Sequence, residues 1–141
     1  MDTDTRHDPA RPTAAPQLPL PGWQPGAFDH HRLHAFRVAR QALADGEALA
    51  RRLPRGTGTL SDQLRRALLS AYLQVAEAAH RTGADRAARF RGARGEAGEA
   101  AAALEAVTLL GLAPASQVAP VLVLLARLCA MLTRLMQPPR S

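Results

Sequence analysis

Residues 60–79 read LSDQLRRALLSAYLQVAEAA, and apolar residues recur in this stretch on two different sides of a helix. One set repeats at intervals of four and three residues, which is the spacing of a single helix face. It comprises Leu64, Leu68, Ala71, Val75 and Ala78. A second apolar patch comprises Leu69, Tyr72, Leu73 and Ala76. A helix with two apolar sides needs two packing partners, so the stretch predicts a helix over about 60–82 packed among other helices.

Three further segments carry apolar residues at helical spacing, over about residues 29–53, 85–110 and 116–136. In the segment from 85, the expected core face comprises Phe90, Ala93, Ala97, Ala100, Leu104 and Val107. Gly95 and Gly98 in the same segment are expected to allow close helix packing. We expect Asp29 to cap the first segment and Pro120 to lie in the first turn of the last one.

Length and composition support one helical domain. The chain has 141 residues, of which 30 are Ala and 21 are Leu, and it has few β-branched residues. Gly and Pro separate the helical segments, and short connections favour antiparallel neighbours. The predicted fold class is therefore all-α, an antiparallel up-down four-helix bundle over residues 28–137.

The two ends of the chain are predicted to be disordered, over residues 1–27 and 138–141. Residues 1–27 hold six of the 11 prolines, a composition that does not build a core. An alternative for this tail is docking of its prolines on an aromatic groove of a partner. The polar, acidic start of the chain lacks the apolar region of a signal peptide, so a cytoplasmic protein is expected.

The last segment has more apolar surface than one bundle can cover. Together with the second apolar patch at 69–76, it predicts self-association, with Leu69, Leu73, Val123 and Met131 as candidate interface residues. The rival interpretation is a membrane span, against which the charge of Arg127 in mid-segment argues. We therefore expect no membrane partner.

No arrangement of residues points to a catalytic site, a cofactor or a metal. His30, His31 and His34 raise the possibility of a metal site, but no third ligand stands at a familiar spacing. Glu77 and His80 form a single Glu-x-x-His pair, whereas di-iron bundles need two. Cys129 is expected to be a buried structural thiol. The sequence thus predicts a protein that is not an enzyme.

Arginine clustering is the clearest functional signal. The net charge is +6, and all 18 basic residues are arginine. Five of them lie within 14 residues: Arg81, Arg86, Arg89, Arg91 and Arg94. Such clusters neutralise phosphates, so they are candidates for binding the backbone of RNA or DNA. The alternative is an ordinary solvated helix face with internal salt bridges.

Two further runs of sequence have a recognisable order and spacing. The first run comprises Leu60, Gln63, Leu64, Arg65, Arg66, Ala67 and Ser70, followed by Gln74 to Ala78 with Glu77. The second comprises Phe90, Ala93, Gly95, Glu96 and Glu99. Together these runs resemble the four-helix-bundle proteins encoded in intervening sequences of bacterial 23S ribosomal RNA genes. The accessory variability proteins of diversity-generating retroelements are related to that family. Gln74, Ala78 and Glu96 depart from the residues usual at those positions.

The resemblance implies a barrel-like homopentamer of four-helix bundles. Its retroelement branch implies binding to a reverse transcriptase and to nucleic acid through a basic surface. The motif positions that would carry over are read as polar or packing contacts between helices: Gln63, Arg66, Ser70, Glu77, Phe90, Gly95 and Glu99. The expected function is thus a non-enzymatic oligomer that binds nucleic acid, and the alternative is a protein-interaction scaffold or a reverse-transcriptase accessory subunit.

Overall fold

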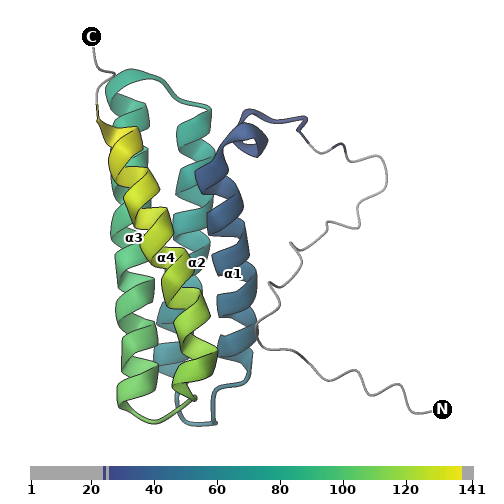
Figure 1. Ribbon diagram of the computed structural model, residues 1–141, viewed down its shortest axis with the longest axis vertical. Coiled ribbons are helices and arrows are strands. Elements are labelled where there is room, and N and C mark those ends of the chain that lie inside the picture. Colours follow the sequence, from purple (N-terminus) through teal and green to yellow (C-terminus); the bar gives the residue numbers. More distant parts are fainter. Residues whose placement is uncertain (1–23, 25, 138–141) are drawn as a thin grey trace, which may run out of the picture.

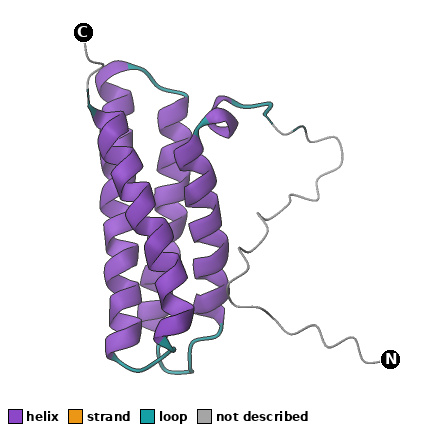
Figure 2. Cartoon of the chain, in the orientation of Figure 1, coloured by secondary structure: helices purple, strands orange, loops and turns teal. Residues whose placement is uncertain are grey.

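A computed structural model describes residue 24 and residues 26–137, and their regular structure is helical throughout. A short 3-10 helix, η1 (Asp29–Arg32), precedes α1 (His34–Arg51), α2 (Gly58–Ala79), α3 (Gly83–Leu109) and α4 (Ala115–Met136). The four α-helices lie side by side in an elongated bundle (Figure 1), and Figure 2 shows the short loops that join them. The predicted all-α, four-helix architecture is confirmed. Most of the predicted tails, 1–27 and 138–141, lies outside the described residues, which leave out 1–23, 25 and 138–141.

Each helix packs against two neighbours. Helices α1 and α3 both contact α2 and α4, whereas within the described part of the chain α1 does not neighbour α3 and α2 does not neighbour α4. The loops over 52–57 and 110–114 lie at one end of the bundle, the lower end in Figure 1. The loop over 80–82 and η1 lie at the other, upper end.

The predicted core faces of α2 and α3 are confirmed in full. All five residues of the first apolar set of α2 are buried, and so are all six of the predicted α3 face. Ala93, Ala97 and Ala100 belong to that α3 face, and their small side chains let α2 and α4 approach it closely. Burying these apolar side chains away from water is the main driving force that holds the bundle together.

Two expectations about helix ends are wrong. Asp29 does not cap a long first helix, because the chain forms η1 and then leaves helical geometry at Leu33, where φ is −84° and ψ is 119°. Pro120 lies inside α4, five residues after Ala115, and so belongs to the second turn. Its side chain is exposed, so the pyrrolidine ring faces solvent instead of the core.

The expectation that Gly95 and Gly98 allow close packing is also wrong. Both lie on the exposed side of α3, and a Cβ atom at either position would meet no atom within 4 Å. The close approach occurs at Gly46 of α1 instead, where a Cβ would collide with the Cδ1 atom of Leu68 in α2. A second close approach is at Gly92, against the side-chain amide of Gln74.

The end of α3 follows the expected glycine rule. Gly111 has a φ of +69°, and its N–H donates to the carbonyl of Thr108 at 3.1 Å. The N–H of Leu112 donates to the carbonyl of Val107 at 2.9 Å, which completes a Schellman motif. Leu112 packs against the core, whereas Leu109 and Leu110 are left exposed at the lower end.

Candidate nucleic-acid interface

The five clustered arginines point in different directions around the start of α3. Arg81 lies in the loop before α3 and forms ion pairs with Glu77, at 3.1 Å, and with Asp85, at 3.3 Å. Arg89 approaches the same two carboxylates at 3.7 Å and 3.9 Å. These four residues balance one another in charge, so Arg81 and Arg89 add little to the net potential at this point.

Two more of the five arginines turn toward neighbouring side chains. The guanidinium of Arg86 lies over the buried ring of Phe90, 5.0 Å from its centroid, in a cation–π contact. The Nε–H group of Arg94 donates to Oγ1 of Thr133 in α4 at 2.9 Å. Arg91 lies on the solvent side of α3. The structure therefore does not gather the five arginines on one face.

The five clustered arginines all lie toward the same end of the bundle, the upper end in Figure 1. Dividing each helix at its midpoint separates an upper half, residues 26–42, 69–95 and 126–137, from a lower half, residues 43–68 and 96–125. The upper half holds ten arginines and three carboxylates, and the lower half holds five arginines and six carboxylates. Formal charge is thus about +7 in the upper half and about −1 in the lower one, counting histidine as neutral.

In the lower half, two carboxyl groups of α3, those of Glu96 and Glu99, lie next to each other. Burial raises the pKa of the Glu96 carboxyl, and the neighbouring carboxylate of Glu99 raises it further, while Arg66 of α2 opposes the shift. Glu96 replaces a residue of the resembled motif, and here it forms a carboxyl pair with Glu99. Two adjacent carboxyl groups do not attract a phosphate, so this part of α3 is left out of the candidate interface.

The other residues of the resembled motifs differ in whether they contact neighbouring side chains. Ser70 accepts a hydrogen bond from the Nε2 group of Gln74 at 3.0 Å, and Phe90 is buried in the core. Glu77 joins α2 to the arginines at the start of α3. Gln63 and Gly95 are exposed. Glu77 and Phe90 therefore contribute to contacts between helices, whereas the Ser70 bond lies within α2 and Gly95 meets no other side chain.

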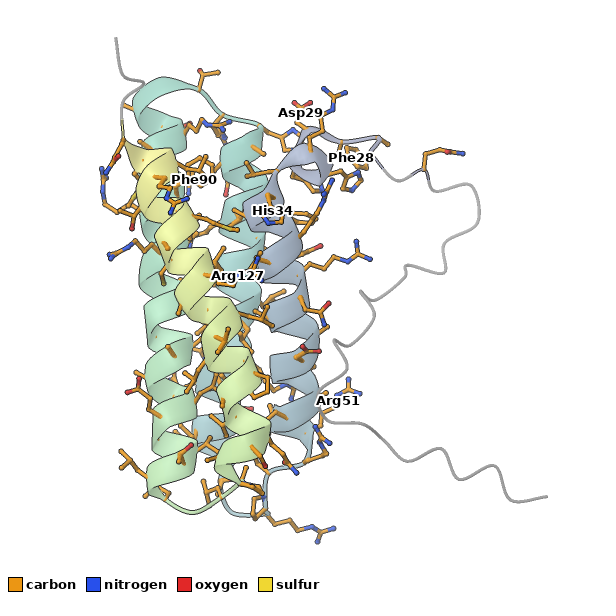
Figure 3. The ribbon with its side chains drawn as sticks, in the orientation of Figure 1. Phe28, Asp29, His34, Arg51, Phe90 and Arg127 are labelled. Atoms are coloured by element: carbon orange, nitrogen blue, oxygen red, sulfur yellow. The ribbon has the colours of Figure 1, made fainter. Side chains whose placement is uncertain are left out.

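A histidine and aromatic cluster at the upper end was missed by sequence reasoning. The Nδ1 atom of His30 and the Nε2 atom of His80 lie 2.9 Å apart, although the residues are 50 positions apart in sequence. The His30 ring also stacks on Phe28 and packs edge-on against Phe36. Phe28, Asp29 and His34 mark this end in Figure 3, far from Arg51 at the lower end. Interactions between segments so distant in sequence leave no local pattern to detect.

The histidines of the described chain do not assemble a metal site. His30 pairs with His80, whereas His34 is exposed on the first turn of α1. Within residues 24 and 26–137, no group of three or more His, Cys, Asp or Glu residues is placed to hold a metal ion.

Cys129 is half-buried instead of fully buried, and its thiol lies 4.0 Å from the carbonyl oxygen of Arg94. Burial raises the pKa of this thiol, and the charge of Arg94 opposes the shift. The thiol is therefore poorly ionised at neutral pH, which is the opposite of what a nucleophile needs.

The candidate interface residues lie on two helices, α2 and α4, that are not neighbours within the described part of the chain. Leu69 and Leu73 are 47% and 54% exposed on α2, and Val123 is 58% exposed on α4. Met131 is half-buried on α4. By length and composition α4 could also cross a membrane, since its hydropathy is high and only 28% of the most apolar window is buried in the bundle. Arg127 is exposed on the same helix (Figure 3).

Comparison with known proteins adds no family assignment. No protein-family profile matches the sequence, and no curated protein matches it significantly.

Proposed function

We propose that this chain is a non-enzymatic, antiparallel four-helix bundle whose upper half binds the phosphate backbone of RNA or DNA. The observation that carries the proposal is the division of charge, with ten arginines against three carboxylates in one half of the bundle. Loops that alternate between the two ends support the antiparallel arrangement. A field of this kind attracts polyanions and depends steeply on salt concentration.

The expected mode of binding is contact with phosphates and not with base edges. Arginines distributed around one end of a bundle present charge over a wide area, but they offer no single helix face to enter a groove. Binding is then weakly selective for sequence. Three arginines of the cluster form no ion pair with a carboxylate of the described residues: Arg86, Arg91 and Arg94. Arg91 is exposed on α3, and neighbouring side chains hold the guanidinium groups of the other two.

The test is a titration of fluorescently labelled structured RNA and duplex DNA with the full chain, at low and at moderate salt. Fluorescence anisotropy measures the binding. A triple variant with Arg86, Arg91 and Arg94 replaced by Gln should bind more weakly. The slope of log K against log salt should flatten by about 0.9 for every phosphate that the variant no longer neutralises.

A second triple variant is the matched control, because it removes the same number of charges from the lower half. It replaces Arg51, Arg52 and Arg55 by Gln. Its binding and salt slope should stay closer to those of the unaltered chain. Failure to bind at micromolar concentration in low salt, or an equal weakening of binding in the two triple variants, would overturn the proposal.

A second candidate function is favoured by the exposed leucines of α2. We propose that copies of the chain associate through Leu69 and Leu73 on one side and Val123 and Met131 on the other. Two different surfaces, one on α2 and one on α4, suit a head-to-tail ring, and the resemblance to the intervening-sequence proteins suggests five copies. A ring of this kind would serve as a scaffold for a protein partner such as a reverse transcriptase.

Light scattering at micromolar concentration tests this second candidate. Leu69→Glu and Leu73→Glu should each shift the chain toward monomer, because a charge would be buried in the contact. Leu109→Glu is the control, since Leu109 is 86% exposed at the lower end and lies outside the proposed contact. An unaltered chain that is monomeric under these conditions contradicts the candidate.

A further inference from the structure

We propose that residues 26–33 form an acid-sensitive clasp, in which His30 and His31 hold the segment before α1 closed at neutral pH and release it when the histidines are protonated. The segment lies across the upper end of the bundle, where η1 contacts both α1 and α2. Two separate sets of polar contacts hold it there, and each depends on a neutral imidazole.

The first set joins η1 to the loop after α2. The Nδ1 atom of His30 and the Nε2 atom of His80 are 2.9 Å apart. The Nδ1 atom of His80 lies 3.8 Å from the Oδ2 atom of Asp29. A neutral imidazole has one donor and one acceptor nitrogen. The consistent assignment has His80 turning its Nδ1–H toward Asp29 and accepting a hydrogen bond from His30 at Nε2.

The contact between His30 and His80 can accommodate one added proton but not two. A single added proton is tolerated, because one imidazolium can donate to the other, neutral ring, and Asp29 faces His80 with a negative charge. A second proton leaves two cations with donors opposed across the 2.9 Å contact. Burial lowers the pKa of His30, and the charges of His31 and His80 lower it further, while Asp29 opposes the shift.

The second set lies within the segment itself. The Nδ1 atom of His31 accepts hydrogen bonds from the backbone N–H groups of Gly26, at 3.1 Å, and Phe28, at 3.3 Å. An imidazolium has no acceptor nitrogen, so protonation of His31 removes both bonds at once. These bonds fold the chain at 26–31 into the turn that presents His30 to His80.

The surroundings of His30 explain what the clasp covers. Asp29 and His31 of η1 and His80 of the loop after α2 are the charged or titratable groups that act on it. From α1 it meets the ring of Phe36, whose centroid is 4.6 Å away, and Tyr72 of α2 lies behind Phe36 at 5.0 Å. Phe36 is only 4% exposed with the clasp closed. Opening exposes an aromatic surface and adds positive charge to the upper half.

The direction of the pH effect follows from the lowered pKa of His30. A folded-state pKa below the ordinary 6.5 means that the open state binds more protons. The closed clasp is then fully stabilised above pH 6.5 and becomes less stable as the pH falls below that value. Two like charges about 4 Å apart in water repel enough to shift such an equilibrium about fivefold.

The experiment is amide hydrogen exchange on the full chain between pH 8 and pH 5, corrected for the intrinsic pH dependence of exchange. The protection of the amides of residues 28–33 should fall by about fivefold or more on acidification, while amides of the core helices keep theirs. His80→Gln should reduce protection of this segment already at pH 8 and weaken its pH dependence. His34→Gln is the matched control, because His34 is exposed nearby and takes no part in these contacts.

Side-chain NMR titration gives an independent measurement. His30 should titrate below the ordinary range in the unaltered chain and move toward it in His80→Gln. Protection of residues 28–33 that does not change with pH, or a His30 titration that is unaffected by His80→Gln, would overturn the clasp. Neither readout depends on nucleic-acid binding.

Discussion

Replacing Gly95 and Gly98 by Ala should stabilise the chain, although both glycines lie inside a helix that is packed in a bundle. Gly in a helix interior is less favourable than Ala by about 1 kcal/mol. A Cβ atom at either position would meet nothing within 4 Å, so no packing penalty offsets this gain. The double variant should therefore gain about 2 kcal/mol, which corresponds to a rise of about 8 °C in Tm for a domain of this size.

Gly46→Ala is the internal comparison, because the added methyl group there would collide with the side chain of Leu68. Its Cβ would collide with Cδ1 of Leu68, whose Cγ and Cδ2 atoms are each 3.4 Å away, and Leu68 is 2% exposed. Overpacking of a core costs about 1–3 kcal/mol, which cancels or exceeds the gain in helix propensity. The expected net change is a destabilisation of between about 0 and 2 kcal/mol.

Urea unfolding followed by circular dichroism at the helix band measures all three variants. The midpoint should rise for the α3 variants and stay level or fall for Gly46→Ala, with an unchanged m-value. A lower stability of Gly95→Ala or Gly98→Ala would refute the reasoning, since it would mean that something packs on the outer side of α3. Repeating the measurement at several protein concentrations would show whether that packing comes from another copy of the chain.

Three further predictions concern single side chains. Leu104→Ala should lower the free energy of unfolding by about 2–5 kcal/mol, because Leu104 is 0% exposed. In the same urea assay Leu109→Ala should change it by less than about 0.5 kcal/mol, because Leu109 is 86% exposed. The hydrogen bond that Arg65 donates to Glu47, at 2.8 Å, lowers the pKa of the Glu47 carboxyl. The free energy of unfolding should therefore decrease as the pH falls below 4.5, and in Glu47→Gln this decrease should be smaller. Cys129 should react with a disulfide reagent at pH 8 more slowly in the folded chain than in urea, because burial raises the pKa of its thiol; equal rates would contradict this.

Acid sensitivity therefore has two separate origins in this chain. Glu47 links α1 to Arg65 of α2 and responds below pH 4.5, in the range of ordinary carboxyl groups. The histidine clasp responds below pH 6.5, at the opposite end of the bundle. A pH scan of overall stability and a scan of exchange at residues 28–33 should consequently show different midpoints.

Sequence periodicity predicted the fold because helix formation and helix burial are largely local properties. The apolar residues of α2 and α3 repeat at the period of the helix, so the side that needs burial can be identified without knowing the partner. Gly111 likewise ends α3 through a backbone conformation that its own residue type favours. Local signals were weaker at the start of α1, where Leu33 interrupts the helix in a way that residue preferences do not indicate.

The candidate site was predicted only in part, for a related reason. The clustering of Arg81 to Arg94 is visible in the sequence, and so is the i,i+4 spacing of Arg81 from Glu77 and Asp85. The approach of Arg89 in α3 to Glu77 in α2 is not, because it depends on how the two helices pack. Gly95 was expected to face a neighbour because Gly in a helix interior is less favourable than Ala, so that a packing reason seemed necessary. Position 95 nevertheless lies off the apolar face that runs through Ala93 and Ala97, and the structure leaves it in open space.

The amino-acid sequence by itself determined that residues 28–137 form four long helices, which sides of α2 and α3 are buried, and that the charge is strongly positive. Composition and short-range periodicity suffice for these properties. Only the tertiary structure decided that the positive charge collects in one half of the bundle and that His30 meets His80. Both depend on which helix ends lie together, and that is set by the packing of segments far apart in the chain.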